Sequence, residues 1–163
     1  MRHPQLEINL RKLEHNACLE VNALAKSGIT VMGVNKVFNG LFETAEAIVK
    51  AGIDVVAESR IYNLRKLQGL SCQKCLLRTP CPSEIEDVVR YADISLNSEI
   101  TVIRLLSREA VKQKKVHHVL LMVDMGDIRE GIWYKNREYL ACGSKNRNSW
   151  ANVRSYDYRH RRL

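Results

Sequence analysis

The stretch that decides the fold is Ile29-Thr30-Val31-Met32-Gly33-Val34, an apolar run that ends directly at Asn35 and Lys36. It has the length and composition of a strand that is buried on both faces, as in a parallel sheet. Upstream, a helix is predicted because apolar residues recur every three or four positions, at Leu10, Leu13, Ala17, Val21 and Leu24. Gly28 is placed to end this helix.

The same unit repeats along the chain. Strand-like runs start near residues 29, 54, 74, 92 and 118, and spacings of roughly 20–25 residues are typical of successive βα units in a parallel sheet. Helical patterns follow these runs, with apolar faces at Ile61, Leu64 and Leu67, at Ile85, Val88 and Val89, and at Ile103, Leu106 and Ala110.

Two local features are also predicted. Leu6, Ile8 and Leu10 alternate with polar residues, which favours a half-buried strand before the first helix. Ser83 and Glu86 have the spacing of a capping box at a helix start.

The repeat leaves two architectures open, a doubly wound sheet and a (β/α)8 barrel. A full barrel needs about 250 residues, whereas this chain has 163 and offers five clear units and part of a sixth. It therefore cannot close a barrel alone.

Charge divides the chain at residue 142. The net charge is +8, of which +5 lies in residues 143–163 and +3 in all the rest. Residues 143–163 have no apolar periodicity, so we expect a basic, irregular tail that is non-native, frame-shifted or disordered. Residues 1–142 are expected to form the folded α/β portion.

The start of the chain and its cysteines indicate a cytoplasmic protein. No apolar run approaches the roughly 20 residues of a membrane span, and the first residues are polar. The five cysteines are read as reduced thiols. Cys72 and Cys75 have zinc-like spacing, but Cys81 lies beyond the opposite end of the same strand, so no metal site is expected.

Polar side chains follow every predicted strand. In parallel α/β folds, functional groups gather where strands end at their carboxyl edge. We expect these residues to ring one mouth: Asn35 and Lys36; Glu58, Ser59 and Arg60; Arg78 and Thr79; Asn97, Ser98 and Glu99; Asp124, Asp127 and Arg129.

Lys36 carries the most information. It stands between Val34 and the pair Val37-Phe38, so partial desolvation is expected. Desolvation disfavours the ammonium form of a lysine, and the neutral amine is the nucleophile that condenses with a carbonyl. The alternative is a lysine that reaches solvent from a strand end.

Arg129 lies in a segment with Gly126 and Gly131, just past a predicted strand. This pattern favours a tight loop that aims a guanidinium into the mouth, where it would suit a phenolate or a carboxylate. The alternative is a surface salt bridge with Asp127 or Glu130. Arg78 allows the same two interpretations.

Four segments in order resemble the alanine racemase-like family of pyridoxal-phosphate enzymes, over about residues 4–140. The likeness is greatest to the ornithine racemase branch, in Asp87–Ser95 and Val123–Gly131. The four segments are Leu6-Glu7-Ile8-Asn9-Leu10 with Leu13 and Asn16; Val31-Met32-Gly33-Val34-Asn35-Lys36; Val56-Ala57-Glu58-Ser59-Arg60 with Asn63-Leu64-Arg65; and Val123-Asp124-x-Gly126-x-x-Arg129-x-Gly131.

The resemblance implies a fold-type III isomerase: a (β/α)8 (TIM) barrel followed by a β domain, acting as a homodimer on an amino acid. Lys36 would bind pyridoxal 5'-phosphate and act as an acid/base group, and Arg129 would contact the phenolic oxygen of the cofactor. The fold expected is thus a partial barrel, incomplete at the C-terminus. The phosphate site and the opposing tyrosine base would lie beyond residue 163, so this chain is expected to be an inactive fragment of a racemase.

Two positions depart from the family pattern. Gly40 stands where alanine racemases carry a tyrosine, and Met122 stands where they often have a lysine, which argues against alanine as the substrate. Two other functions stay open. One is a non-racemase member of the same barrel family, such as a cofactor carrier, a decarboxylase or an aldolase. The other is a nucleic-acid binder using the basic tail, an interpretation weakened by the near-neutral body.

Overall fold

The computed structural model describes residues 4–126, 128, 130–136 and the backbone of 153–156. Six parallel strands form one sheet in the order β1-β2-β3-β4-β5-β8. Their bounds are β1 Met32–Val34, β2 Val55–Glu58, β3 Gln73–Leu76, β4 Ile94–Asn97, β5 His117–Leu121 and β8 Val153–Tyr156. A separate pair joins β6 Val123–Asp124 to β7 Ile132–Trp133.

One helix precedes β1, and one helix lies between each two successive strands from β1 to β5. They are α1 Leu10–Ala25, α2 Phe42–Lys50, α3 Ile61–Lys66, α4 Ile85–Tyr91 and α5 Ile100–Lys112, with 3-10 turns η1 at Lys36–Phe38 and η2 at Pro82–Glu84. The five strands predicted from the sequence are all present, as are the helices predicted at α1, α3, α4 and α5. Helix α2 has no counterpart in the sequence prediction.

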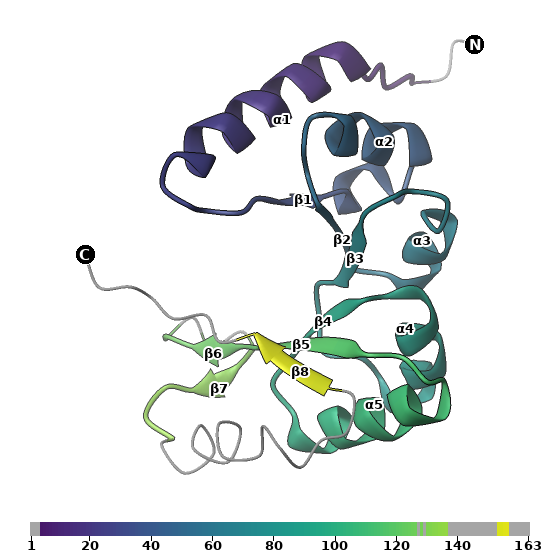
Figure 1. The fold of residues 1–163 in the computed structure, drawn as a ribbon, viewed down its shortest axis with the longest axis vertical. Coiled ribbons are helices and arrows are strands. Elements are labelled where there is room, and N and C mark those ends of the chain that lie inside the picture. The colour runs from purple at the N-terminus through teal and green to yellow at the C-terminus, as the bar shows by residue number, and fades with distance from the viewer. Residues whose placement is uncertain (1–3, 127, 129, 137–152, 157–163) are drawn as a thin grey trace.

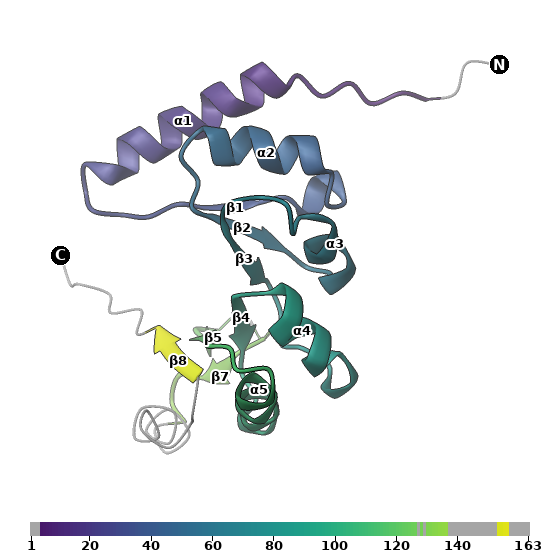
Figure 2. The same ribbon diagram turned by 45° about the vertical axis from the view of Figure 1, so that its right-hand side comes forward.

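The strand order decides between the two architectures left open above. In a doubly wound sheet the order reverses at a switch point, so helices cover both faces. Here β1 to β5 lie side by side in sequence order, with β8 next to β5, and α2 to α5 line one side of a curved row of strands (Figures 1 and 2). This is the wall of a (β/α)8 barrel, as the resemblance implied.

Residues 4–9 form no strand, and Asn9 instead caps α1 by accepting a hydrogen bond from the Lys12 amide at 3.0 Å. The predicted strand was wrong because a short alternation also fits the lead-in to an amphipathic helix. Gly28 does end the helix, with a φ of 68° and its amide bonded to the Ala25 carbonyl.

The capping box lies two residues earlier than predicted, at Cys81 and Glu84. The carboxylate of Glu84, and not that of Glu86, accepts a hydrogen bond from the Cys81 backbone amide at 3.1 Å. Glu86 instead pairs with Arg90 on the exposed face of α4. Pro82 starts η2 here, which moves the start of the helical segment towards the N-terminus.

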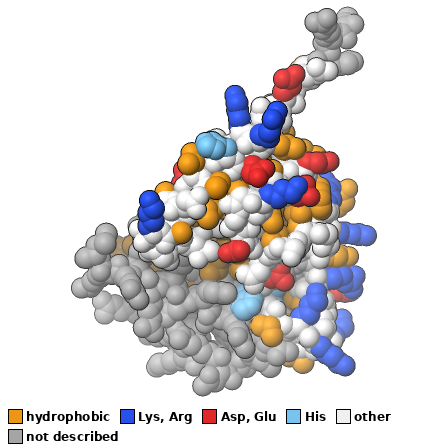
Figure 3. All heavy atoms as spheres, turned by 45° about the horizontal axis from the view of Figure 1, so that its top comes forward, with side chains coloured by type: hydrophobic (Ala, Val, Ile, Leu, Met, Phe, Trp, Pro, Cys, Tyr) orange, Lys and Arg blue, Asp and Glu red, His pale blue; other side chains and the backbone are white. Residues whose placement is uncertain are grey.

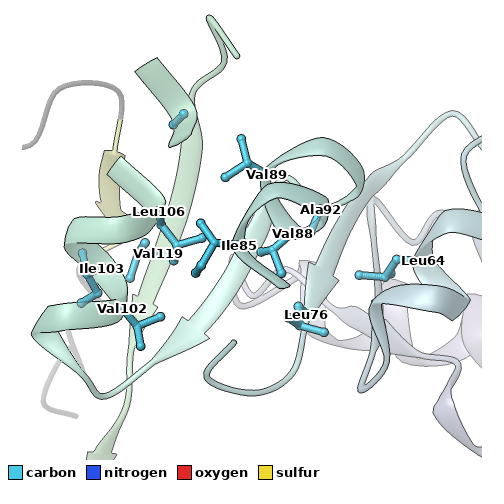
Figure 4. Close-up of a cluster of buried hydrophobic side chains, with 11 residues drawn as sticks. Leu64, Leu76, Ile85, Val88, Val89, Ala92, Val102, Ile103, Leu106 and Val119 are labelled. Atoms are coloured by element: carbon cyan, nitrogen blue, oxygen red, sulfur yellow. The ribbon is translucent and has the colours of Figure 1, made fainter. Parts of the chain in front are cut away.

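The helix-covered face of the sheet holds most of the core. Figure 4 shows side chains of α4 and α5 packed against β3 and β5, with Leu76 and Leu106 fully buried. A second cluster lies under α1 and α2, where Ala45, Ile48 and Val56 pack with half-buried residues of α1. The predicted apolar faces of α3, α4 and α5 are therefore confirmed.

The opposite face of the sheet is less well covered. Val55, Ala57, Cys75 and Ile94 form a small cluster there, and the neighbours that pack on it are only partly buried: Met32, Leu77, Leu96 and Leu120. In a closed barrel this face would be the packed interior.

Strand β8 differs from the expectation of an irregular tail. Val153–Tyr156 pair in parallel with β5, with Val119 opposite Ser155. The rest of 143–163 lies outside the described residues, so the division at residue 142 stays a prediction.

Charges of both signs are interspersed on the face shown in Figure 3, over the described residues. Within that same part of the chain, no helix is long and apolar enough to cross a membrane.

A row of buried, hydrogen-bonded polar groups lies at the amino ends of β4 and β5. The side chain of His117 is 1% exposed; one ring nitrogen lies 2.8 Å from Ser95 Oγ and the other 3.2 Å from the Ala92 carbonyl. Desolvation by burial lowers the pKa of His117 to about 4. The ring is therefore neutral at neutral pH, accepting from Ser95 and donating to Ala92.

This burial predicts a pH-dependent stability. An unfolded histidine takes up its proton near pH 6.5, whereas folded His117 does so only near pH 4. The unfolded chain binds more protons between these values, so the free energy of unfolding should fall as the pH drops from 6.5 to 4, by about 3 kcal/mol. Urea unfolding at several pH values measures this free energy of unfolding. In His117→Gln, its decrease between pH 6.5 and pH 4 should be smaller by the amount that His117 contributes.

The exposed residue His15 of α1 provides the control, and His15→Gln should keep the full pH dependence. If His117→Gln and the unmodified chain lose stability in parallel over this range, His117 is not the group that titrates.

Candidate active site

The carboxyl ends of neighbouring strands lie side by side, because the backbone ladder continues one residue beyond them. The Asn35 amide donates to the Ala57 carbonyl at 2.9 Å, and the Leu77 amide to the Glu58 carbonyl at 2.8 Å. The Met122 amide donates to the Asn97 carbonyl at 2.8 Å. The predicted gathering of strand ends at one edge is therefore present for β1 to β5.

The side chains at these ends do not form a single ring, however. Asn35, Glu58 and Asn97 are each 0% exposed and turn towards the helices instead of the mouth. Alternation along a strand is the cause: Glu58 is two residues from Val56, whose side chain packs with the helix-side cluster. For these three residues the expected ring was wrong.

A smaller group does lie together at the edge. The Arg78 Nε donates to the Ser59 carbonyl at 2.8 Å, and the hydroxyls of Thr79 and Ser98 are 3.3 Å apart. These residues link the ends of β2, β3 and β4.

Arg78 serves as a structural residue at this edge. It forms a two-pronged ion pair with Glu84, at 2.7 and 2.8 Å. Hydrogen bonding to Arg78 holds the pKa of Glu84 below its usual value, and the same contact raises the pKa of Arg78. Of the two interpretations offered by the sequence, the structure supports the salt bridge.

Lys36 begins the turn η1 directly after β1. Its side chain is exposed, so the partial desolvation expected from the sequence is absent. The reason is that the 3-10 turn carries the chain past the end of the sheet, and the neighbouring Val37 is itself 76% exposed. Among the described residues, none pairs with the Lys36 amine.

The loop that carries Lys36 is closed by a buried amide. Asn35 Nδ2 donates to the Leu41 carbonyl at 3.1 Å, which joins the two ends of the loop. Thr44 of α2 donates to Asn35 Oδ1 at 2.8 Å. Both side chains are 0% exposed.

A second set of contacts holds the middle of the loop. Asn63 Nδ2 lies 3.3 Å from Asn39 Oδ1 and 3.2 Å from Glu58 Oε2. Asn39 and Gly40 both have left-handed backbones, with φ of 52° and 71°. A Cβ placed on Gly40 would lie 2.6 Å from Asn63 Cβ, so the departure from the family tyrosine at this position has a local structural cause.

The segment predicted to form a loop around Arg129 is described in part, since Arg129 and Asp127 lie outside the described residues. Asp124 Oδ1 accepts from the Gly126 amide at 2.8 Å and from the Ile128 amide at 3.3 Å. Gly126 and Gly131 each have a φ of 127°, and a Cβ on Gly131 would lie 2.6 Å from the Asp124 amide nitrogen. The described residues between β6 and β7 therefore show the glycine-dependent backbone that was predicted, whereas the loop at Arg129 and the direction of its side chain stay predictions.

The cysteines show the properties of buried or isolated thiols. Burial raises the pKa of Cys75 to about 12, and it also raises the pKa of the half-buried Cys72. In the described part of the chain, no cluster of three or more potential ligands could hold a metal ion.

Sequence reasoning missed Thr44 and Asn63 as members of the site. A usable signal exists for Asn63, which is a polar residue one position before the buried Leu64 in a short amphipathic helix. Thr44 lies in α2, the helix that the periodicity did not reveal.

Residues 8–153 match the family described as alanine racemase, N-terminal domain. The chain is 41% identical over 131 residues to an ornithine racemase of Acetoanaerobium sticklandii, covering 80% of this chain and 37% of that protein. It is 34% identical over 150 residues to a lysine racemase of Thermotoga maritima, covering 90% of this chain and 42% of that protein.

A solved structure supports the fold. The alanine racemase of Clostridium difficile 630 in complex with cycloserine superposes with a TM-score of 0.76 at 18% identity, covering 90% of this chain and 40% of the other. The chain spans less than half the length of the two curated relatives, 37% of the ornithine racemase and 42% of the lysine racemase. The family match over most of the sequence, together with the barrel wall and its ordered strand ends, shows that the chain belongs to the alanine racemase N-terminal domain family.

Proposed function

We propose that this chain is the lysine-bearing barrel portion of a pyridoxal-phosphate-dependent amino-acid racemase of the ornithine racemase type. The observation that carries the proposal is the Lys36 amine, which lies at the carboxyl edge of a parallel sheet and has no partner among the described residues. The 41% identity to an ornithine racemase supports the same function.

The surroundings of Lys36 fit an aldehyde cofactor. An amine that condenses with an aldehyde must be free of ion pairs and open to approach, and Lys36 satisfies both requirements within the described structure. When bound, pyridoxal phosphate withdraws electrons from the substrate and so stabilises a carbanion at its α-carbon.

The chain would contribute residues that hold the cofactor and that transfer protons to and from the substrate. Lys36 would be the residue that holds the cofactor, through its amine nitrogen. With a substrate bound, the same amine would serve as an acid/base group that takes a proton from the substrate α-carbon or returns one to it. Arg129 is proposed as the residue that contacts the phenolic oxygen, on the resemblance of its segment.

The substrate and assembly are proposed from the relatives. Two proteins named as racemases of basic amino acids, ornithine and lysine, are the relatives that support the choice of substrate class. They also favour racemisation over a carrier, decarboxylase or aldolase function. A homodimer of the longer protein is part of the proposal.

A chimaera tests the function directly. Residues 1–140 would replace the matching segment of the Acetoanaerobium sticklandii ornithine racemase, which supplies the remaining length. We expect the chimaera to interconvert L- and D-ornithine, measured by chiral chromatography. Lys36→Ala in the chimaera should remove this activity.

The control is Lys26→Ala, which changes an exposed lysine at the end of α1 and should leave the rate unchanged. A folded chimaera that racemises ornithine equally well with and without Lys36 would reject the assignment of the lysine.

A further inference from the structure

The loop of Lys36 combines an exposed amine with a buried support. The four polar side chains that hold the loop are 0–2% exposed: Asn35, Thr44, Glu58 and Asn63. Burying a polar side chain is unfavourable unless it is hydrogen-bonded, because it loses its hydrogen bonds to water. A fully hydrogen-bonded buried network, in return, holds the surrounding backbone in one arrangement. The Asn35–Thr44 pair joins the two ends of the loop. The Glu58–Asn63 pair acts at a different point of the loop.

Glu58 and Asn63 reach the loop from a different βα unit. Glu58 ends β2, and Asn63 lies in the following helix α3. Glu58 Oε2 accepts from Asn63 Nδ2 at 3.2 Å and from the Ser59 amide at 3.3 Å. These contacts fix the Asn63 side chain against the loop.

Asn63 then acts on the left-handed turn that ends η1. Its amide donates to Asn39 Oδ1, and its Cβ occupies the space beside Gly40. Lys66 closes the same contact from the solvent side, with its Nζ 3.3 Å from Asn63 Oδ1 and 3.5 Å from the Asn39 carbonyl. The backbone of the turn is tied directly to Lys36, because the Asn39 amide donates to the Lys36 carbonyl at 3.1 Å.

We propose that Asn63, held by Glu58, is a positioning residue for Lys36: it fixes the Asn39–Gly40 turn so that the amine is presented at the sheet edge in one orientation. This inference rests on the proposed function. Ordering the loop before the cofactor arrives avoids the entropy that would otherwise be lost on binding.

The buried carboxylate has one further feature that suits this role. Glu58 Oε1 has no hydrogen-bond partner and is shielded from solvent. Only Oε2 is used to hold Asn63, so a glutamine can supply the same acceptor whereas a leucine cannot.

Hydrogen exchange on the 163-residue chain without cofactor tests the positioning itself. Asn63→Ala should speed exchange of the Asn39 and Leu41 amides roughly tenfold, because the turn loses its buried contacts and opens more often. Glu58→Leu should have the same effect, and Glu58→Gln should stay close to the unmodified chain.

Asn97→Ala is the matched control. Asn97 is also a fully buried amide at the end of a strand, but its Nδ2 donates to the carbonyl and the hydroxyl of Ser95 and not to the loop of Lys36. We expect this variant to lower the urea midpoint while leaving exchange at Asn39 and Leu41 unchanged. If Asn63→Ala also leaves those two amides unchanged, or if Asn97→Ala accelerates them equally, the positioning role is rejected.

A spectral titration with pyridoxal phosphate separates this inference from the function on which it rests. The apparent Kd should rise several-fold in Asn63→Ala and stay unchanged in Asn97→Ala. A rise of equal size in both variants would overturn the inference. If the unmodified chain gives no spectral change with the cofactor, the proposed function fails, and the exchange rates still decide whether Asn63 orders the turn.

Discussion

The constraint on which this structure depends is the alternation of side chains along parallel strands whose ends are joined by a continuous backbone ladder. The ladder brings the carboxyl ends of β1 to β5 to one edge. Alternation then sends Asn35, Glu58 and Asn97 under the helices, where they are completely buried. The side chains available for chemistry at this edge are those of the residues that come after the strands. Among the described ones, Lys36 offers an amine without a partner.

This division explains how an exposed lysine can still occupy a defined place. The energy that orders the loop comes from buried hydrogen bonds behind it and not from contacts to the amine itself. Two successive βα units contribute, the first through Thr44 and the second through Asn63. The geometry of the lysine therefore depends on how α2 and α3 pack against the sheet.

Much of the fold could be predicted because it is encoded in periodicity. Apolar runs and helix faces such as Val88 and Val89 repeat at a regular spacing, and Gly28 ends a helix for the steric reason expected. The run Ile29–Val34 contains a strand as predicted, but it is not buried on both faces, because Ile29 and Val34 are 48% and 44% exposed. Predictions that relied on a few residues were less reliable. The alternation of Leu6, Ile8 and Leu10 and the spacing of Ser83 and Glu86 each fit a second local structure equally well, and the second structure is the one present.

The candidate site could be predicted in part. The sequence placed Lys36 at a strand end, but its exposure follows from a 3-10 turn that leaves no mark in hydrophobic periodicity. The support from Asn63 depends on a contact across 24 positions of sequence, which single-sequence patterns do not reveal. The turn between β6 and β7 was predicted from its two glycines, since few other residues adopt a φ of 127°.

The central claim is that Lys36, because of its place at the sheet edge, is the amine that captures an aldehyde. The most direct measurement is borohydride reduction of the chain with a limiting amount of pyridoxal phosphate, followed by peptide mass spectrometry to locate the label. The account predicts that Lys36 carries most of the label and that exposed lysines such as Lys26 and Lys50 carry little. A label spread evenly over the exposed lysines, or concentrated on one of them other than Lys36, would contradict it.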